Sequence, residues 1–167
     1  MLVLRAAKVG VVAASALHAS LVTFGNLTDY GTNFTFVRHV MSMDTIFPDS
    51  TITWRAISNE MLHSAAYALI IATEAVVAVL CWIGAWRLLR ALLAEARVFN
   101  QAKSVAVAGF ALGLALWQVG FITIAGEWFG MWMSQQWNGI ESAFRIVAIL
   151  LGGLIFVAMR DGELTAG

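Results

Sequence analysis

Four long stretches of apolar residues limit what this chain can fold into. They cover about residues 9–25, 64–86, 105–126 and 140–159. A helix of about 20 apolar residues crosses the hydrocarbon core of a bilayer. Because water is absent from that core, backbone groups must be hydrogen-bonded within their own segment. Each stretch is therefore predicted to be a transmembrane helix.

The composition excludes an ordinary water-soluble domain. Apolar residues make up 60% of the 167 residues and charged residues 12%, and the mean hydropathy is +0.81. A soluble domain carries about a quarter of charged residues, and a chain of this size has too much surface to hide so many apolar side chains. We expect one all-α domain over residues 1–167, a four-helix transmembrane bundle covered by the lipid bilayer.

The lysines and arginines predict the direction of the spans. With four spans, seven of them lie at one end: Arg5, Lys8, Arg87, Arg90, Arg97, Lys103 and Arg160. Three lie at the other end: Arg38, Arg55 and Arg145. Because cytoplasmic loops carry the excess of positive charge, both termini are predicted to be cytoplasmic.

The two outer connections, about 26–63 and 127–139, are predicted to form an ordered cap with short interfacial helices in both loops. Two sets of apolar residues repeat at helical spacing on either side of Pro48: Phe36, Val40 and Met43, then Trp54, Ile57 and Met61. We expect two short helices there, lying at the outer membrane interface. Trp128, Trp132 and Trp137 in the third loop are typical of side chains that settle at headgroup depth.

Several segments of the chain resemble a known family. They are residues 26–45, Trp54-Arg55-Ala56-Ile57, Leu62-His63 with Tyr67, Phe99-Asn100 with Lys103, Gly126-Glu127-Trp128-Phe129 and Trp137-Asn138-Gly139. Together they resemble the bacterial family of predicted small integral membrane proteins, a four-span family of unknown function. The resemblance covers almost the whole chain and implies a multi-pass protein of the bacterial inner (cytoplasmic) membrane. It implies no activity and supplies no catalytic residue.

Four polar residues within or near the spans are candidates for a ligand or proton site: Glu74, His18, Gln118 and Arg145. Intramembrane ionisable groups are costly and default to a functional hypothesis. Glu74 lies 11 residues after His63, about 16 Å along a helix and near the bilayer midplane. A pocket for a quinone-like molecule or a proton relay is one interpretation. The other is a structural hydrogen bond between helices, with His18 or Arg145 as the partner of Glu74.

A weaker hypothesis concerns metal binding in the cap. His39, Met41, Met43 and His63 all fall on the same side of the membrane, and thioether and imidazole ligands suit copper(I). Methionine is also a common apolar filler. A haem held by His18 with His39 or His63 is a further alternative. The sequence requires no cofactor, so the cofactor stays unknown.

Protein partners are the last class of candidate. The cap tryptophans Trp128, Trp132 and Trp137 are suited to a docking face, and Gly109 and Gly113 form a small-residue seam that lets helices approach closely. The seam serves either packing within the bundle or association with a partner or a second copy. Net charge is zero and no basic block exists, so nucleic acid is excluded as a partner.

The favoured function is a non-catalytic accessory or assembly subunit of a larger membrane complex. The alternative is a protein that binds a small molecule, a proton or a metal ion in an intramembrane polar pocket. An enzyme is less favoured, because no nucleophile–base pair, phosphate loop or zinc-type spacing is present. No residue is assigned a catalytic role.

Overall fold

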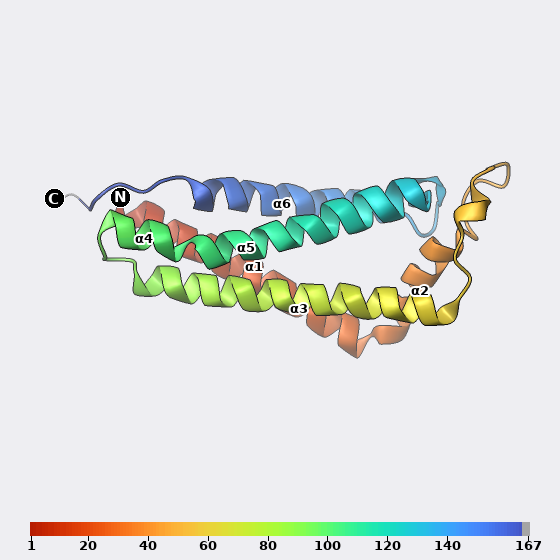
Figure 1. The fold of residues 1–167 in the computed structure, drawn as a ribbon, viewed down its shortest axis with the longest axis horizontal. Coiled ribbons are helices and arrows are strands. Elements are labelled where there is room, and N and C mark those ends of the chain that lie inside the picture. The colour runs from red at the N-terminus through yellow and green to blue at the C-terminus, as the bar shows by residue number, and fades with distance from the viewer. Residues whose placement is uncertain (165–167) are drawn as a thin grey trace.

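The chain forms four long helices of which successive ones run antiparallel, and its N-terminus and the end of the described chain lie at the same end of the bundle (Figure 1). The structure is a computed structural model that describes residues 1–164, and these contain no strand. The long helices are α1 (Leu2–Thr28), α3 (Glu60–Arg90), the run of α4 (Ala96–Ala102), α5 (Ser104–Leu114) and η2 (Ala115–Trp128), and α6 (Ile140–Ala158). Each is long and apolar enough to cross a membrane, which confirms the predicted four-span, all-α fold class.

Helix α3 shows how the sequence sets the helix ends. The Asn59 side chain accepts hydrogen bonds from the backbone N–H groups of Met61 and Leu62, and so satisfies donors that a helix start leaves unpaired. Arg87 and Arg90 occupy the last turn, where cations favour the negative end of the helix dipole. The apolar run between these signals therefore becomes one helix of 31 residues.

Small residues bring α3 and α5 into close contact at the centre of the bundle. A Cβ atom on Gly84 of α3 would stand 2.7 Å from the Cα atom of Ala106 in α5. One on Gly109 would stand 2.8 Å from Sγ of Cys81. Such approach is possible only where a side chain is missing or very short. Val12, Ala16 and Phe110 complete this core and are fully buried.

The third long helix changes its winding halfway along. Over η2, Ala115–Trp128, the chain forms a π-helix. The Phe129 N–H donates to the Ile124 carbonyl five residues earlier, at 3.1 Å. The Thr123 hydroxyl donates to the carbonyl of Gln118, again five residues earlier, at 2.9 Å. A π-helix is wider than an α-helix and is found mostly in short pieces, frequently at functional sites.

We call residues 29–59 and 129–139 the cap, which closes the end of the bundle opposite the termini (Figure 1). It contains α2 (Tyr30–Ser42) and two single turns, η1 (Thr53–Arg55) and η3 (Met131–Met133). A buried apolar cluster joins its two segments: Val40, Met43, Phe129 and Met131. The hydroxyls of Thr45 and Ser134 add a hydrogen bond of 2.8 Å between them.

The cap contains less helix than predicted, since the third loop forms only the turn η3. Of the two helices predicted in the first loop, one forms as α2, but the second, expected through Trp54, Ile57 and Met61, is reduced to the turn η1. The physical reason is that Asn59 caps α3 and draws Met61 into that helix. Ile57 instead lies in extended chain, and its N–H donates to the Met41 carbonyl at 2.8 Å.

Candidate ligand-binding cavity

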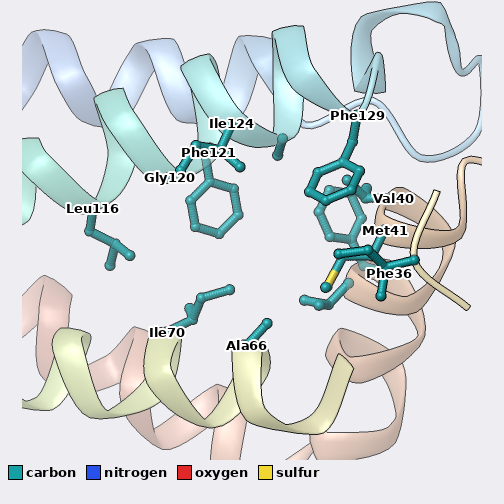
Figure 2. A pocket seen from close by; sticks show the side chains of 13 residues that line it. Phe36, Val40, Met41, Ala66, Ile70, Leu116, Gly120, Phe121, Ile124 and Phe129 are labelled. Carbon is teal, nitrogen blue, oxygen red and sulfur yellow. The ribbon is translucent and has the colours of Figure 1, made fainter. Parts of the chain in front are cut away.

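An apolar cavity of about 310 Å³ lies between the cap and the long helices. Figure 2 shows Phe36 and Met41 of α2, Ala66 and Ile70 of α3, and residues of η2 around it. Every residue that lines this outer cavity is apolar or glycine. Its size and lining are those of a small-molecule pocket, for which about 300 Å³ is the usual lower limit.

The local chain conformation explains why this space is not filled. Residues on the facing walls are small, with Ala66 on α3 and Gly120 and Ala125 on η2. The Phe121 ring projects from η2 into the space opposite Ile70 (Figure 2). The small residues leave the rest of the space open.

A second, inner cavity of about 200 Å³ adjoins the first and is partly polar. The two share Phe36, Val37, Ile70 and Phe121 as lining residues. The inner one is also lined by Asn26, Tyr67 and Glu74. The two cavities are therefore neighbours on either side of shared side chains, the outer one apolar and the inner one partly polar.

Three side chains form the polar part of the inner cavity. Glu74 is 3% exposed and Tyr67 2%. The Asn26 amide donates to Oε2 of Glu74 at 2.6 Å, and the Tyr67 hydroxyl donates to the Asn26 carbonyl at 3.0 Å. Tyr67 and Glu74 are seven residues apart, two turns along one face of α3. The predicted intramembrane acid is thus buried, and its hydrogen-bond partner is Asn26.

Of the three candidate residues named with Glu74, only His18 comes close to it. Glu74 and His18 line a common small cavity of about 20 Å³, together with Trp117. No hydrogen bond joins them among residues 1–164. Gln118 and Arg145 are exposed, and Arg145 bonds Ser142 on its own helix at 3.1 Å. Neither lines a cavity with Glu74.

Sequence reasoning missed Asn26 and Tyr67 as parts of this site. The spacing of Tyr67 and Glu74 was a usable signal, because residues seven apart share a helix face. Asn26 gave no such signal. It was assigned to the outer loop, whereas α1 continues to Thr28 and carries Asn26 beside α3.

The four candidate metal ligands make separate contacts. Nδ1 of His39 lies 2.8 Å from Asp44, and the ring stacks on Trp137 at 4.6 Å between centroids. Met41 lines the outer cavity, and Met43 is buried in the cap cluster. Nε2 of His63 donates to the Ile57 carbonyl at 2.7 Å. Residues 1–164 contain no group of three or more His, Cys, Asp or Glu arranged to hold a metal ion.

The candidate docking residues divide between the surface and the interior. Trp128 and Trp132 are 47% and 49% exposed, while Trp137 is half-buried against His39. The Arg55 guanidinium lies 4.8 Å over the Trp128 ring. Gly109 and Gly113 face inward, Gly109 toward Cys81 of α3 and Gly113 toward Leu150 of α6. The small-residue seam is therefore occupied by packing within the chain.

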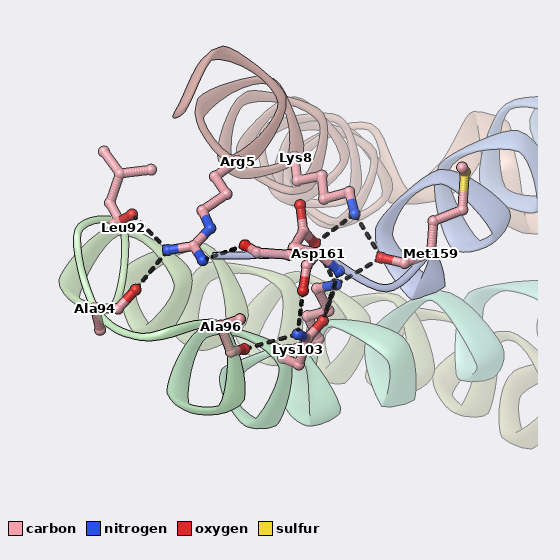
Figure 3. A network of polar contacts seen from close by, with 10 residues as sticks. Arg5, Lys8, Leu92, Ala94, Ala96, Lys103, Met159 and Asp161 are labelled. Carbon is pink, nitrogen blue, oxygen red and sulfur yellow. Dashed lines mark hydrogen bonds and ion pairs between the residues drawn. The ribbon is translucent and has the colours of Figure 1, made fainter. Parts of the chain in front are cut away.

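A second buried polar cluster, the terminal clamp, lies at the other end of the bundle (Figure 3). We define it as Arg5, Lys8, Lys103 and Asp161. Nζ of Lys8 and of Lys103 lie 2.6 and 2.5 Å from the same Asp161 carboxylate oxygen. Arg5 is fully buried and donates to the carbonyls of Ala94 and Gly162 at 2.6 and 2.9 Å. The clamp thereby ties α1, the α3–α4 turn, α5 and the C-terminal segment together.

The charge state of the clamp follows from its contacts. Burial by itself would raise the pKa of Asp161, but hydrogen bonds and charge attraction from Lys103 and Lys8 outweigh it and hold that pKa below its ordinary value. Asp161 is therefore ionised at neutral pH. The sequence analysis used Arg5, Lys8 and Lys103 only as markers of membrane orientation, and so missed this cluster.

Together, the four spans, the capped end and the intramembrane cavity define a small polytopic integral membrane protein with a pocket inside its helix bundle. The chain belongs to the family described as "Predicted small integral membrane protein", whose model matches residues 4–160. This match confirms the family resemblance found in the sequence. The family is one of unknown function. No curated protein and no solved structure matches the chain.

Proposed function

We propose that this protein binds an amphipathic, membrane-soluble small molecule in the neighbouring cavities between the cap and Glu74. Quinones are the model class for such a ligand. The observation that carries the proposal is the pair of neighbouring cavities, an apolar one of about 310 Å³ and one of about 200 Å³ lined by a buried carboxyl, an amide and a phenol. Binding of a small molecule was the function expected from the sequence as the alternative to an accessory subunit.

The lining favours a ring-bearing ligand with hydrogen-bonding oxygens. Phe36 and Phe121 line both cavities, and aromatic rings pack well against a flat ring. At the inner end, the Asn26 amide donates to one oxygen of Glu74, and the Tyr67 hydroxyl donates to the Asn26 carbonyl. The remaining Glu74 oxygen makes no side-chain hydrogen bond within residues 1–164. A polar head that reaches Glu74 therefore gains a partner that the fold does not already use.

The test is binding of decylubiquinone, a quinone with a short alkyl tail, to the full chain purified in detergent. Trp117 lines the inner cavity, so quenching of tryptophan fluorescence gives a binding curve. Ala66→Leu adds three carbons inside the outer cavity and is expected to weaken binding about tenfold or more, as overfilled pockets do. Ala65→Leu is the matched control, since Ala65 is exposed on the same helix and lines neither cavity.

Replacing Glu74 tests the polar end separately. Glu74→Leu removes the carboxyl and is expected to weaken decylubiquinone binding about tenfold, while Glu74→Gln, which keeps a hydrogen-bonding group there, is expected to bind more tightly than Glu74→Leu. Lack of saturable binding to the unaltered protein, or equal affinity in Ala65→Leu and Ala66→Leu, would overturn the proposal.

The exposed aromatic side chains in and next to the cap favour a second role, the accessory or assembly subunit expected from the sequence. Trp54, Trp128 and Trp132 are 71%, 47% and 49% exposed. Such side chains serve either the membrane interface or a protein partner. Gentle extraction from the native membrane tests this role. A second protein at fixed stoichiometry, lost in Trp132→Ser, supports it, and isolation of the chain alone removes it.

The cellular setting is part of the proposal. Seven cationic residues near the termini against three near the cap support cytoplasmic termini, and the family resemblance supports the bacterial inner membrane. In that setting the cap faces outward, with α2 lying at the outer interface. The single membrane domain of residues 1–167 acts as a binding protein, with no catalytic role assigned.

A further inference from the structure

A groove runs along the outside of the bundle at the end that holds the termini. Its two adjoining parts have volumes of about 500 and 630 Å³. They share Asn100, Gln101 and Arg160 as lining residues. The groove lies beside the terminal clamp, between α4, the start of α5 and the segment that follows α6. It is separate from the cavity at Glu74 and shares no lining residue with it.

The charge in this groove is positive where a ligand has access. Arg97 and Arg160 line it and are exposed. Two carboxylates also line its wall, the buried Asp161 and the exposed Glu163, so the two arginines outnumber the one exposed carboxylate. Asp161 lies against the ammonium groups of Lys8 and Lys103, and Glu163 accepts from the Ala96 N–H at the start of α4 at 3.0 Å. The arginines are therefore the charges available to an incoming anion.

Lys103 adds to the positive field but is not free to bind. Its three donors are used by Asn100 at 2.7 Å, by the Met159 carbonyl at 2.6 Å and by Asp161. An ammonium group has no fourth donor. Direct contacts to an anion must come from Arg97 and Arg160, with Gln101 and Ser104 as uncharged donors on the same wall.

The groove is built on a fixed base. The Asn100 side chain donates to the Asp161 carbonyl at 2.8 Å and accepts from the Asp161 N–H at 3.0 Å. This pair of bonds holds the segment carrying Arg160 against the helix carrying Arg97. The backbone segments that carry Arg97 and Arg160 are thus held together by contacts of Asn100.

The groove continues from its charged part onto the apolar spans. Val107 of α5 and Ala158 of α6 line the same wall as Ser104 and Arg160. A ligand that fits both parts has an anionic head and an apolar tail. Basic pockets between transmembrane helices are the usual binding sites of anionic phospholipid headgroups.

We propose that this groove binds an anionic phospholipid, with the phosphate on Arg97 and Arg160 and an acyl chain along Val107 and Ala158. Arginine suits this role because its planar fork matches two phosphate oxygens. The lipid would hold the C-terminal segment, and with it the terminal clamp, at the membrane surface.

The experiment is native mass spectrometry of the detergent-purified full chain with added phosphatidylglycerol, phosphatidylcholine or inorganic phosphate. The unaltered protein is expected to retain phosphatidylglycerol in preference to phosphatidylcholine, and to retain no inorganic phosphate. Arg97→Gln and Arg160→Gln are each expected to lower retention of phosphatidylglycerol about fivefold, and the double variant by more.

The matched control is Arg87→Gln with Arg90→Gln, which removes two arginines near the same end that do not line the groove. Equal retention of the two lipids by the unaltered protein overturns the proposal without any variant. So does an equal loss in the control, which would indicate attraction to the whole charged end. Retention of inorganic phosphate at the same affinity would assign the groove to a free anion instead of a lipid.

Discussion

Two buried carboxyl groups, Glu74 and Asp161, are held in different ways. Asp161 has two ammonium groups within hydrogen-bond distance. Glu74 has only the Asn26 amide among residues 1–164. A buried carboxyl with a full set of cationic partners is typical of a structural role, whereas one with an amide partner and an adjoining cavity is available to a ligand. The contacts of the two carboxyls therefore differ: Asp161 belongs to a clamp, and Glu74 belongs to the proposed binding site.

Asp161→Asn tests the clamp. It leaves the ammonium groups of Lys8 and Lys103 buried with no counter-charge, and removal of one partner from a buried ion pair costs about 3–5 kcal/mol. The unfolding temperature in detergent, followed by circular dichroism, is therefore expected to fall. Asp49→Asn, an exposed position in the cap, is expected to leave the unfolding temperature unchanged. Equal effects from the two variants would contradict a clamp.

The same carboxyl predicts a pH dependence. Because the pKa of Asp161 is lowered by folding, its contribution to stability is present above the ordinary value of 3.8 and is lost as the pH falls through the lower folded value. The stability difference between the unaltered protein and Asp161→Asn is expected to stay constant from about pH 5 to 8 and to shrink in stronger acid. A difference that already closes between pH 6 and 8 is incompatible with an ionised Asp161.

Residue-level prediction from the sequence worked where an unusual residue stood in an apolar run. Glu74 was identified for that reason, and its burial follows from its place in α3. Asp161 was missed because a carboxyl near a chain end looks like part of a solvated tail. Its burial arises only when α1, α5 and the C-terminal segment meet, and no local pattern in the sequence encodes that meeting.

At the element scale, the spans were predictable because about 20 apolar residues leave few alternatives to a membrane helix. The winding of η2 was not predictable. Its residues, such as Ala115, Leu116 and Trp117, suit an α-helix equally well, and the π-helix forms only in the packed bundle. The outer cavity is lined by residues of η2, α2 and α3 that meet only in the folded chain, so it too was beyond reach of the sequence.

Gly84→Ala tests the close packing of α3 on α5. The added Cβ would lie 2.7 Å from the Ala106 backbone, so the helices must separate, at a cost of about 1–3 kcal/mol. Gly152→Ala is the matched control, because a Cβ there meets nothing within 4 Å and alanine favours helix by about 0.5–1 kcal/mol. The unfolding temperature is expected to fall in Gly84→Ala and to stay the same or rise in Gly152→Ala. Equal stability of both would rule out a tight α3–α5 contact.

At the scale of the whole molecule, the even number of spans puts both termini on one side (Figure 1). The predicted orientation then assigns the cap to the outside and the terminal clamp to the cytoplasm. A reporter enzyme that is active only outside the cytoplasm is expected to work when inserted beside Asp49 and to fail after Arg97. Activity in the reverse pattern would refute the orientation.

The central claim is that the space between the cap and Glu74 holds a small molecule in the membrane. Native mass spectrometry of the full chain, extracted gently from its own membrane, tests this most directly. The 18.1 kDa chain is predicted to carry a non-covalent small molecule of constant mass, retained in Ala65→Leu and depleted in Ala66→Leu and Glu74→Leu. A bare chain, or the same adduct at equal occupancy in all three variants, would contradict the claim.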